Sequence, residues 1–163
     1  MEQREQSRVW KFNNDIDTDQ IIASQYLLLS SIEEMKKFTF ESIYKDFSSD
    51  VIEGDVIAAG ENFGCGSSRE QAPRVLKELG IKAIVAKSFA RIFFRNSINI
   101  GLPVIICEKL YENINDKDLI EIDFTNGIVK KDDLEFKCTK LPGHMQTILN
   151  SDGLIEYLNR KAD

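Results

Sequence analysis

The sequence predicts an α/β fold with a parallel βαβαβ core and additional antiparallel strands. Between residues 55 and 107, short continuously apolar runs alternate with segments whose apolar residues recur with helical spacing. Continuous apolar runs are typical of parallel strands that are buried on both faces and joined by helices. From residue 118 to 142 the apolar residues instead alternate with period two around Asn126-Gly127, which favours an antiparallel hairpin.

The elements follow from these patterns in chain order. Residues 8–12 predict a strand, 13–22 a turn-rich acidic segment, and 31–47 a helix in their first half, opened by Ser31. The core strands are expected at 55–60, 81–86 and 103–107, with helices at 69–79 and 88–100, and one or two further helices at 144–161. Because there is no linker or repeat, we expect a single domain over residues 1–163.

Composition excludes several classes of partner. The net charge is −6, and the 21 basic residues are scattered among 27 acidic ones without a basic block, so we expect neither nucleic acid nor a membrane surface as a partner. The N-terminus lacks an apolar core, and no apolar run approaches the roughly 18 residues of a membrane span. We therefore expect a cytoplasmic protein.

The cysteines and aspartates do not form a recognisable metal site. Cys65, Cys107 and Cys138 lack CxxC spacing, so we expect reduced thiols and no metal or iron–sulfur cluster bound by this chain. The alternating aspartates of "NDIDTDQ" begin like a calcium loop, but the glycine and the distal glutamate that such a loop requires are missing. We interpret them as Asx-turn and helix-capping residues.

The stretch "FGCGSSRE" (63–70) joins an expected strand to an expected helix. It is not a dinucleotide fingerprint, because Arg69 stands where the third glycine belongs, and no lysine follows as in a P-loop. It is not a nucleophile elbow either, since neither Ser67 nor Ser68 is flanked as Gly-x-Ser-x-Gly. These exclusions leave an anion site of another kind.

The residue types of this loop suit a carboxylate. Gly64 and Gly66 let the backbone approach a ligand, the serines supply short donors, and the helix expected near Arg69 directs its free N–H groups outward. The Arg69 guanidinium adds a bidentate fork. The loop is therefore interpreted as a carboxylate pocket.

The alternative role for the serines is helix capping. Ser67-x-x-Glu70 matches a capping box. Pro73 is tolerated only in a first turn, so the regular helix is expected to begin nearer Glu70, which would free the serines.

The segments "GENFGCGSSREQAPRVLKELGIKAIVAKSFARIFFRNSINIGLPVI" (60–105) and "NNDIDTDQIIASQYL" (13–27) resemble the 3-isopropylmalate dehydratase small-subunit family of the aconitase superfamily. The resemblance extends from about Val9 to Leu158. It implies a swivelling β/β/α domain that acts with a large subunit, and that subunit carries a [4Fe–4S] cluster whose iron binds the substrate. The implied reaction isomerises 2-isopropylmalate to 3-isopropylmalate by dehydration and rehydration in leucine biosynthesis.

The resemblance also implies roles for individual residues. Ser67 matches the base that removes the proton α to a carboxylate, while Ser68 and Arg69 match residues that bind substrate carboxylate. Asp19 matches an aspartate that organises the active site. Gln71 departs from the family's frequent histidine, so a role that needs a charge there is in doubt.

The string "YLLL" bears on the substrate. In relatives the residues after "DTDQII" reach its variable substituent, and Leu28 stands where an arginine suits an extra carboxylate. Tyr26, Leu27 and Leu28 are therefore expected to favour an alkyl group, because an apolar wall does not compensate for burying a charge. Isopropylmalate is the first expectation; dimethylmalate, methylmalate and homoaconitate remain alternatives. Without the resemblance, the alternative is that Tyr26 to Leu29 are simply core residues.

Two readings from other classes remain open. One is a stand-alone serine or cysteine hydrolase that uses His144, the single histidine, as its base. The other is a carboxylate-binding module without catalysis.

Overall fold

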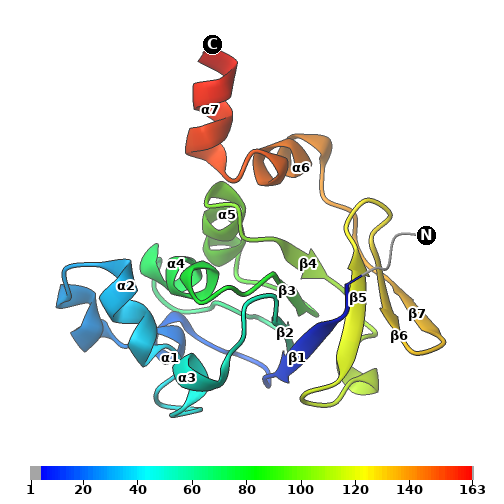
Figure 1. Ribbon diagram of the computed structural model, residues 1–163, viewed down its shortest axis with the longest axis horizontal. Helices are drawn as coiled ribbons and strands as arrows, with labels where there is room; N and C mark the ends of the chain where they lie inside the picture. The colour runs from blue at the N-terminus through cyan, green and yellow to red at the C-terminus, as the bar shows by residue number, and fades with distance from the viewer. Residues whose placement is uncertain (1–4, 163) are drawn as a thin grey trace.

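The computed structural model describes residues 5–162, in which seven strands form one curled sheet (Figure 1). The strand order is β4-β3-β2-β1-β5-β6-β7. The strands are β1 (Ser7–Lys11), β2 (Val56–Ala59), β3 (Ala83–Ala86), β4 (Val104–Ile106), β5 (Leu119–Asp123), β6 (Ile128–Lys131) and β7 (Leu134–Lys137).

The sheet has a parallel half and an antiparallel half. Strands β1, β2, β3 and β4 pair in parallel, and β1 pairs antiparallel with β5, which leads into the β5-β6-β7 meander. The turn between β5 and β6 holds the Asn126-Gly127 pair, with Gly127 at a φ of +65°. Both the parallel core and the hairpin are confirmed.

Side chains on the two faces of the parallel half enter different cores, because successive strand residues point to opposite faces. One face packs against the helices and includes Trp10, Ile57 and Ile84. The other packs against the β5–β7 layer and includes Val9, Val56, Val85, Ile120, Val129 and Phe136. Figure 1 shows the resulting β/β/α arrangement, with the helices on one side of β1–β4 and β5–β7 on the other.

The helices differ most from expectation in residues 31–47. Ser31 caps the first helix there by accepting a bond from the Glu34 N–H at 3.2 Å, as expected. The α-helix is short, however: it ends at Met35 and is followed by a 3₁₀ turn over Lys36–Phe38, after which the chain turns at Phe40, which has a φ of +57° and is fully buried. The α-helices are α1 (Thr18–Ile21), α2 (Ile32–Met35), α3 (Phe47–Asp50), α4 (Gln71–Glu78), α5 (Arg91–Asn99), α6 (Gly143–Asn150) and α7 (Leu154–Ala162). The 3₁₀ turns are η1 (Ser24–Leu28), η2 (Lys36–Phe38) and η3 (Tyr111–Asn113).

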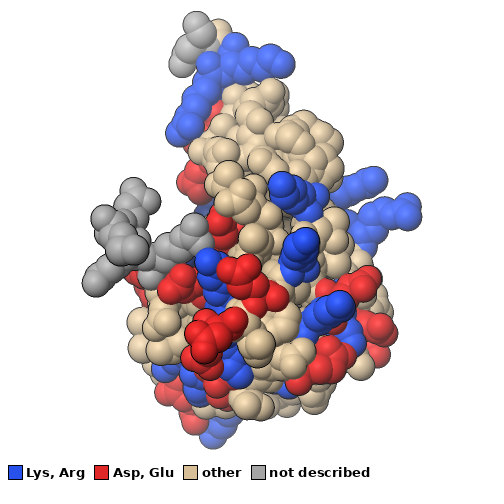
Figure 2. Space-filling model, turned by 90° about the vertical axis from the view of Figure 1, so that its right-hand side faces the viewer, with Lys and Arg blue, Asp and Glu red and all other residues tan. Residues whose placement is uncertain are grey.

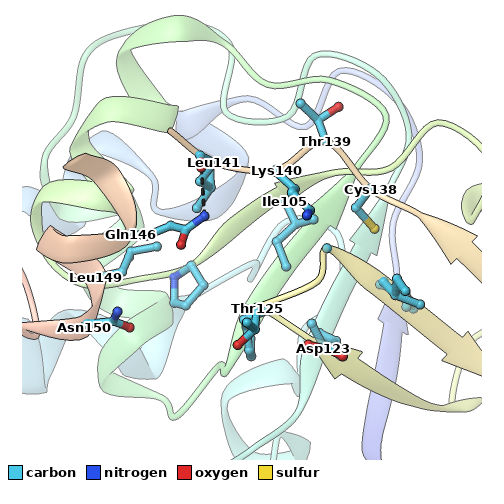
Figure 3. Close-up of a pocket in the computed structure, with 16 residues that line it drawn as sticks. Ile105, Asp123, Thr125, Cys138, Thr139, Lys140, Leu141, Gln146, Leu149 and Asn150 are labelled. Carbon is cyan, nitrogen blue, oxygen red and sulfur yellow. Dashed lines mark hydrogen bonds between the residues drawn. The ribbon is translucent and has the colours of Figure 1, made fainter. Parts of the chain in front are cut away.

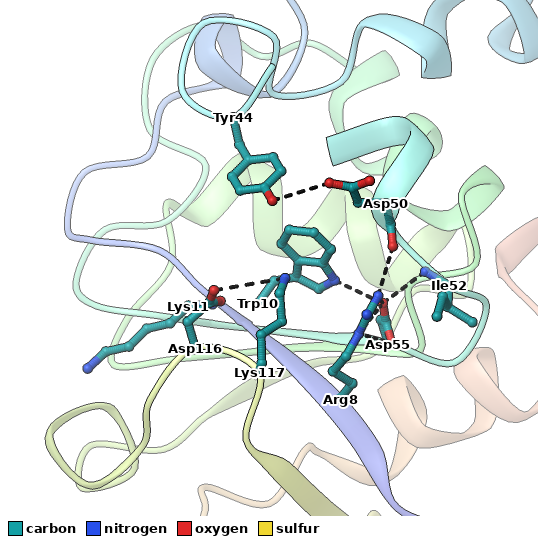
Figure 4. A network of polar contacts seen from close by, with 9 residues as sticks. All are labelled: Arg8, Trp10, Lys11, Tyr44, Asp50, Ile52, Asp55, Asp116 and Lys117. Atoms are coloured by element: carbon teal, nitrogen blue, oxygen red, sulfur yellow. Dashed lines mark hydrogen bonds and ion pairs between the residues drawn. The ribbon is translucent and has the colours of Figure 1, made fainter. Parts of the chain in front are cut away.

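A buried carboxylate ties β1 to the start of β2 (Figure 4). Asp55 accepts bonds from Arg8 Nη2 at 2.7 Å, the Trp10 indole N–H at 2.9 Å and the Ile52 N–H at 2.9 Å. Burial alone would raise the pKa of Asp55, but the hydrogen bonds outweigh it and lower that pKa below its ordinary value. The Asp55 carboxylate is therefore charged in the folded protein at neutral pH.

Replacing Asp55 with alanine is expected to reduce the free energy of unfolding at pH 7 by about 2–4 kcal/mol, because it leaves buried donors without an acceptor. Since the folded pKa is lowered, this contribution is present above the unfolded aspartate pKa of about 3.9 and is lost as the pH falls through the folded value. Urea unfolding between pH 7 and pH 3 should show the gap between wild type and variant shrinking below about pH 4. The exposed Asp46→Ala is the control, and a gap independent of pH would contradict the assignment.

The face of the molecule in Figure 2 carries acidic and basic side chains intermixed over its lower part. The lower part of this face therefore lacks the continuous basic surface that binding a phosphate backbone requires. Among residues 5–162, no helix combines the length and apolar character needed to cross a membrane.

Candidate active site

The loop of residues 60–70, which we call the serine loop, lies where the carboxyl ends of parallel strands meet. This is the usual place for a ligand in such sheets. Two isolated parallel bridges hold it between its neighbours. One joins Cys65 to Asp17 in the loop after β1, and the other joins Phe63 to Phe89 in the loop after β3. Segments far apart in the sequence are thereby brought to one edge of the sheet.

The two glycines of the loop are required by its conformation. Gly64 has a φ of +83°, and a Cβ there would lie 2.1 Å from Phe93 Cγ. Gly66 has a φ of +97°, and its Cβ would lie 3.3 Å from Thr18 Oγ1. The Thr18 hydroxyl donates to the Ser67 carbonyl at 2.9 Å, so α1 holds the serines in place. Gly64 thus serves close packing, in addition to the ligand approach expected of it.

The serines do not cap a helix. Regular helix α4 begins at Gln71, with Glu70 as an N-cap residue that makes no side-chain capping bond. The capping-box alternative is therefore wrong, and the later helix start expected from Pro73 is confirmed. Both Ser67 and Ser68 are exposed, and neither hydroxyl makes a hydrogen bond within the part of the chain that the structure describes.

Ser67 and Ser68 open onto a pocket of about 200 Å³, which we call the serine pocket. Its opposite wall comes from α5. Helix α4 was expected to direct its free N–H groups at this site, but Gln71 does not line the pocket. The first turn of α5 does, and among the described residues the N–H groups of Arg91, Ile92 and Phe93 have no acceptor. The lining residues are Thr18, Gly64, Gly66, Ser67, Ser68, Arg69, Ala90, Arg91, Ile92, Phe93 and Asn96.

One side of the Arg69 guanidinium is hydrogen-bonded within the protein, and the other side is free to bind a ligand. Its Nη1 donates to Asp19 Oδ1 at 2.9 Å and to the Ile22 carbonyl at 3.0 Å. The bond from Arg69, with a second from the Ser24 N–H, lowers the pKa of Asp19. Within residues 5–162 the Nε–Nη2 edge makes no hydrogen bond, so the structure brings Asp19 and Arg69 together and leaves a bidentate edge for a carboxylate.

The three residues of the "YLLL" string taken as substrate-facing differ in their surroundings. Tyr26 stacks on Phe38 with ring centroids 4.1 Å apart and donates to Glu41. Leu27 packs against the helix-side core, whereas Leu28 is 91% exposed. Of the three, only Leu28 has an apolar side chain that is exposed and not packed against the core.

The described residues contain no catalytic pair that would support the hydrolase hypothesis. His144 lies exposed on α6 and does not line the serine pocket, and in the described chain no hydrogen bond joins it to Ser67 or Cys65. Burial, and then the nearby Asp17, raises the pKa of the Cys65 thiol, which opposes a thiolate nucleophile. A nucleophile without a base in reach does not support hydrolysis.

A second pocket, of about 220 Å³, lies between β4, the β5–β6 hairpin and α6 (Figure 3). Its lining includes Ile105, Leu149 and Cys138 but no residue of the serine loop. The interaction between the two thiols lowers the pKa of Cys107 to about 7 and raises the pKa of Cys138. Among the described residues no group of three or more His, Cys, Asp or Glu side chains could hold a metal ion.

Comparison with known proteins places the fold in a family. The chain matches the family model of the aconitase C-terminal domain over residues 2–109. It is 48% identical over 152 residues to 3-isopropylmalate dehydratase small subunit 1 of Archaeoglobus fulgidus, covering 92% of this chain and 94% of the relative. It is 46% identical over 156 residues to the isopropylmalate/citramalate isomerase small subunit of Methanocaldococcus jannaschii, covering 94% and 93%. A crystal structure of a 3-isopropylmalate dehydratase from M. jannaschii has a TM-score of 0.91 at 44% identity, covering 96% and 94%.

The three-layer fold and the Ser-Ser-Arg pocket define the class, an aconitase-type α/β domain. Within it, the chain belongs to the family of 3-isopropylmalate dehydratase small subunits. The family resemblance read from residues 13–27 and 60–105 is thereby confirmed, and so is the fold class.

Proposed function

We propose that this chain is the small subunit of a cytoplasmic hydro-lyase that isomerises 2-isopropylmalate to 3-isopropylmalate in leucine biosynthesis. It would act as a single swivel domain together with a large subunit. The naming of its relatives as dehydratase small subunits supports both the reaction and the partner.

The observation that carries the proposal is that the serine pocket is a formed but open half of a site. Ser67 and Ser68 are exposed, while the backbone around them is fixed by buried contacts to α1 and α5. Excluding water from a pocket strengthens the electrostatic interactions that assist proton abstraction from carbon and prevents side reactions. A second subunit that closes over the serines would supply the missing wall.

The residues of this half-site suit proton transfer beside a carboxylate. Ser67 would take the proton from the carbon next to a carboxylate, and the electron pair of that C–H bond would become the new double bond as the hydroxyl leaves the neighbouring carbon. The cluster proposed for the large subunit would supply the Lewis acid that accepts the hydroxyl. On rehydration Ser67 would give a proton to the carbon that lost the hydroxyl, while the hydroxyl adds to the carbon that lost the proton. A serine hydroxyl is a poor base until it loses its proton, and its alkoxide forms near neutral pH only where positive groups stabilise it. Arg69 and the free N–H groups of α5 supply them, and Asp19 orients Arg69.

The [4Fe–4S] cluster that the family implies does not fit the residues of this chain. Cys107 and Cys138 lie on the opposite side of the sheet's parallel half from the helices, in the β5–β7 core, and only Cys65 belongs to the serine loop. We propose that the large subunit carries the cluster.

Leu28 is proposed to select the alkyl substituent across the subunit interface. Replacing Leu28 with arginine is expected to lower kcat/KM for 2-isopropylmalate by about 10–200-fold, because a charge replaces an apolar wall, and to favour homoaconitate. The turnover of the reconstituted complex with each substrate measures the switch. Leu119→Arg, on β5 and also exposed, is the matched control, and an unchanged substrate ratio in Leu28→Arg would remove Leu28 from the site.

Turnover of the wild-type complex against a substrate panel tests the function itself. We expect 2-isopropylmalate to give the highest kcat/KM among isopropylmalate, dimethylmalate, methylmalate and homoaconitate. A higher value for another acid would reassign the enzyme within its family.

A further inference from the structure

We infer that Arg91 is a second carboxylate-binding residue of the serine pocket, which takes the substrate carboxylate that Arg69 does not hold. The inference rests on the proposed function, since it concerns a dicarboxylate substrate. It adds a specificity-determining residue from α5, outside the Ser-Ser-Arg loop.

The position of Arg91 is fixed relative to the serines by the backbone. Arg91 is the first residue of α5 and lines the same pocket as Ser67 and Arg69. The residue before it, Ala90, donates its N–H to the Phe63 carbonyl at 2.9 Å, at the start of the serine loop. The beginning of α5 therefore cannot move away from the serines without breaking the sheet-edge contacts between the two loops.

The charge of Arg91 is not compensated within the protein. Arg8 is paired with Asp55 and Arg69 with Asp19, but Arg91 is exposed and makes no ion pair or hydrogen bond with any residue in the range 5–162. It also stands at the positive end of the α5 macrodipole, beside N–H groups without acceptors, where a cation is unfavourable. A cation at this position therefore does not stabilise the local fold. It would, however, stabilise a bound anion.

The substrate offers two anions to such a pocket. A malate substituted at one carbon carries two carboxylates, and so does its dehydrated product. The open Nε–Nη2 edge of Arg69 can hold one of them. A second carboxylate in the same pocket would lie beside an uncompensated guanidinium, and Arg91 is the remaining cation among the lining residues.

The test is the kinetics of Arg91→Gln and Arg91→Lys with saturating large subunit. We expect Arg91→Gln to raise KM for 2-isopropylmalate about 10–100-fold while kcat falls much less, as loss of a charged hydrogen bond predicts. Arg91→Lys should lie between, because an ammonium keeps the charge but not the planar fork. Thermal unfolding of Arg91→Gln should be unchanged or slightly raised, because a cation leaves the positive end of α5.

Arg95→Gln is the matched control. Arg95 is exposed one turn further along the same helix and does not line the pocket, so its loss should leave KM within about twofold if the effect is local. A competitive inhibitor that lacks the hydroxyl, isopropylsuccinate, adds a direct binding readout. Of its two mono-amides, the one that replaces the carboxylate facing Arg91 should bind wild type and Arg91→Gln with the same affinity.

An unchanged KM in Arg91→Gln, or an equal rise in Arg95→Gln, would overturn the inference. The proposed function has a separate test in Ser67→Ala. If that variant is inactive while Arg91→Gln behaves like wild type, only the role of Arg91 is wrong.

Discussion

Replacing Ser67 with alanine is expected to lower kcat of the reconstituted complex by about 10²–10⁴-fold, the range that general acid–base catalysis contributes. The hydroxyl is exposed and makes no bond to the described residues, so its loss removes no contact that stabilises the fold. Assembly with the large subunit and the unfolding temperature should therefore match wild type. The measurement is steady-state turnover of 2-isopropylmalate alongside gel filtration of the complex.

Ser68→Ala is the matched control for this prediction. It removes a neighbouring, equally exposed hydroxyl that is proposed to bind carboxylate, and it should affect KM more than kcat. Near-normal turnover in Ser67→Ala would show that another group takes the proton. Equal losses of kcat in both variants would mean that the loop acts as a unit in which Ser67 has no distinct role.

Replacing Gly64 with alanine is expected to reduce the free energy of unfolding by about 2–5 kcal/mol and to remove activity. The added Cβ would enter the Phe93 ring at 2.1 Å from Cγ, and the φ of +83° adds strain. Relief of this clash requires the serine loop to move away from α5, which opens the pocket. Urea unfolding of the isolated chain and turnover of the complex measure the two effects.

Gly143→Ala provides the matched control at the start of α6. A Cβ there meets nothing within 4 Å, and its φ is not left-handed, so the change should be neutral or slightly stabilising. If Gly64→Ala unfolded at the wild-type urea concentration with full turnover, the packing of the serine loop against Phe93 would be wrong.

Most of the fold could be predicted from the sequence because its signals are local. The continuous apolar runs of β2 and β3 and the period-two hairpin around Asn126-Gly127 each depend on a few neighbouring residues. The Asp55 network could not be predicted, since Arg8 and Asp55 are 47 residues apart and meet only once β1 lies beside β2. Likewise, the turn at Phe40 is set by burial in the tertiary core.

The candidate site was predictable only in part. The loop sequence indicated a carboxylate pocket around Ser67 and Arg69, but it assigned the facing helix end to α4. The α5 wall depends on the parallel pairing of β2 with β3, which places Phe89 beside Phe63. The expected parallel pairing could have provided this signal, because neighbouring parallel strands end at one edge. The apolar string at 26–29 gave no direction for its side chains, and only the structure separates Leu28 from Tyr26.

The most direct test of the central claim, that this chain supplies half of a shared active site, is a three-way turnover measurement with 2-isopropylmalate. The chain alone, the cluster-loaded large subunit alone and their mixture are assayed under the same conditions. We predict that only the mixture interconverts 2- and 3-isopropylmalate. Turnover by either component alone at the rate of the mixture would contradict the account.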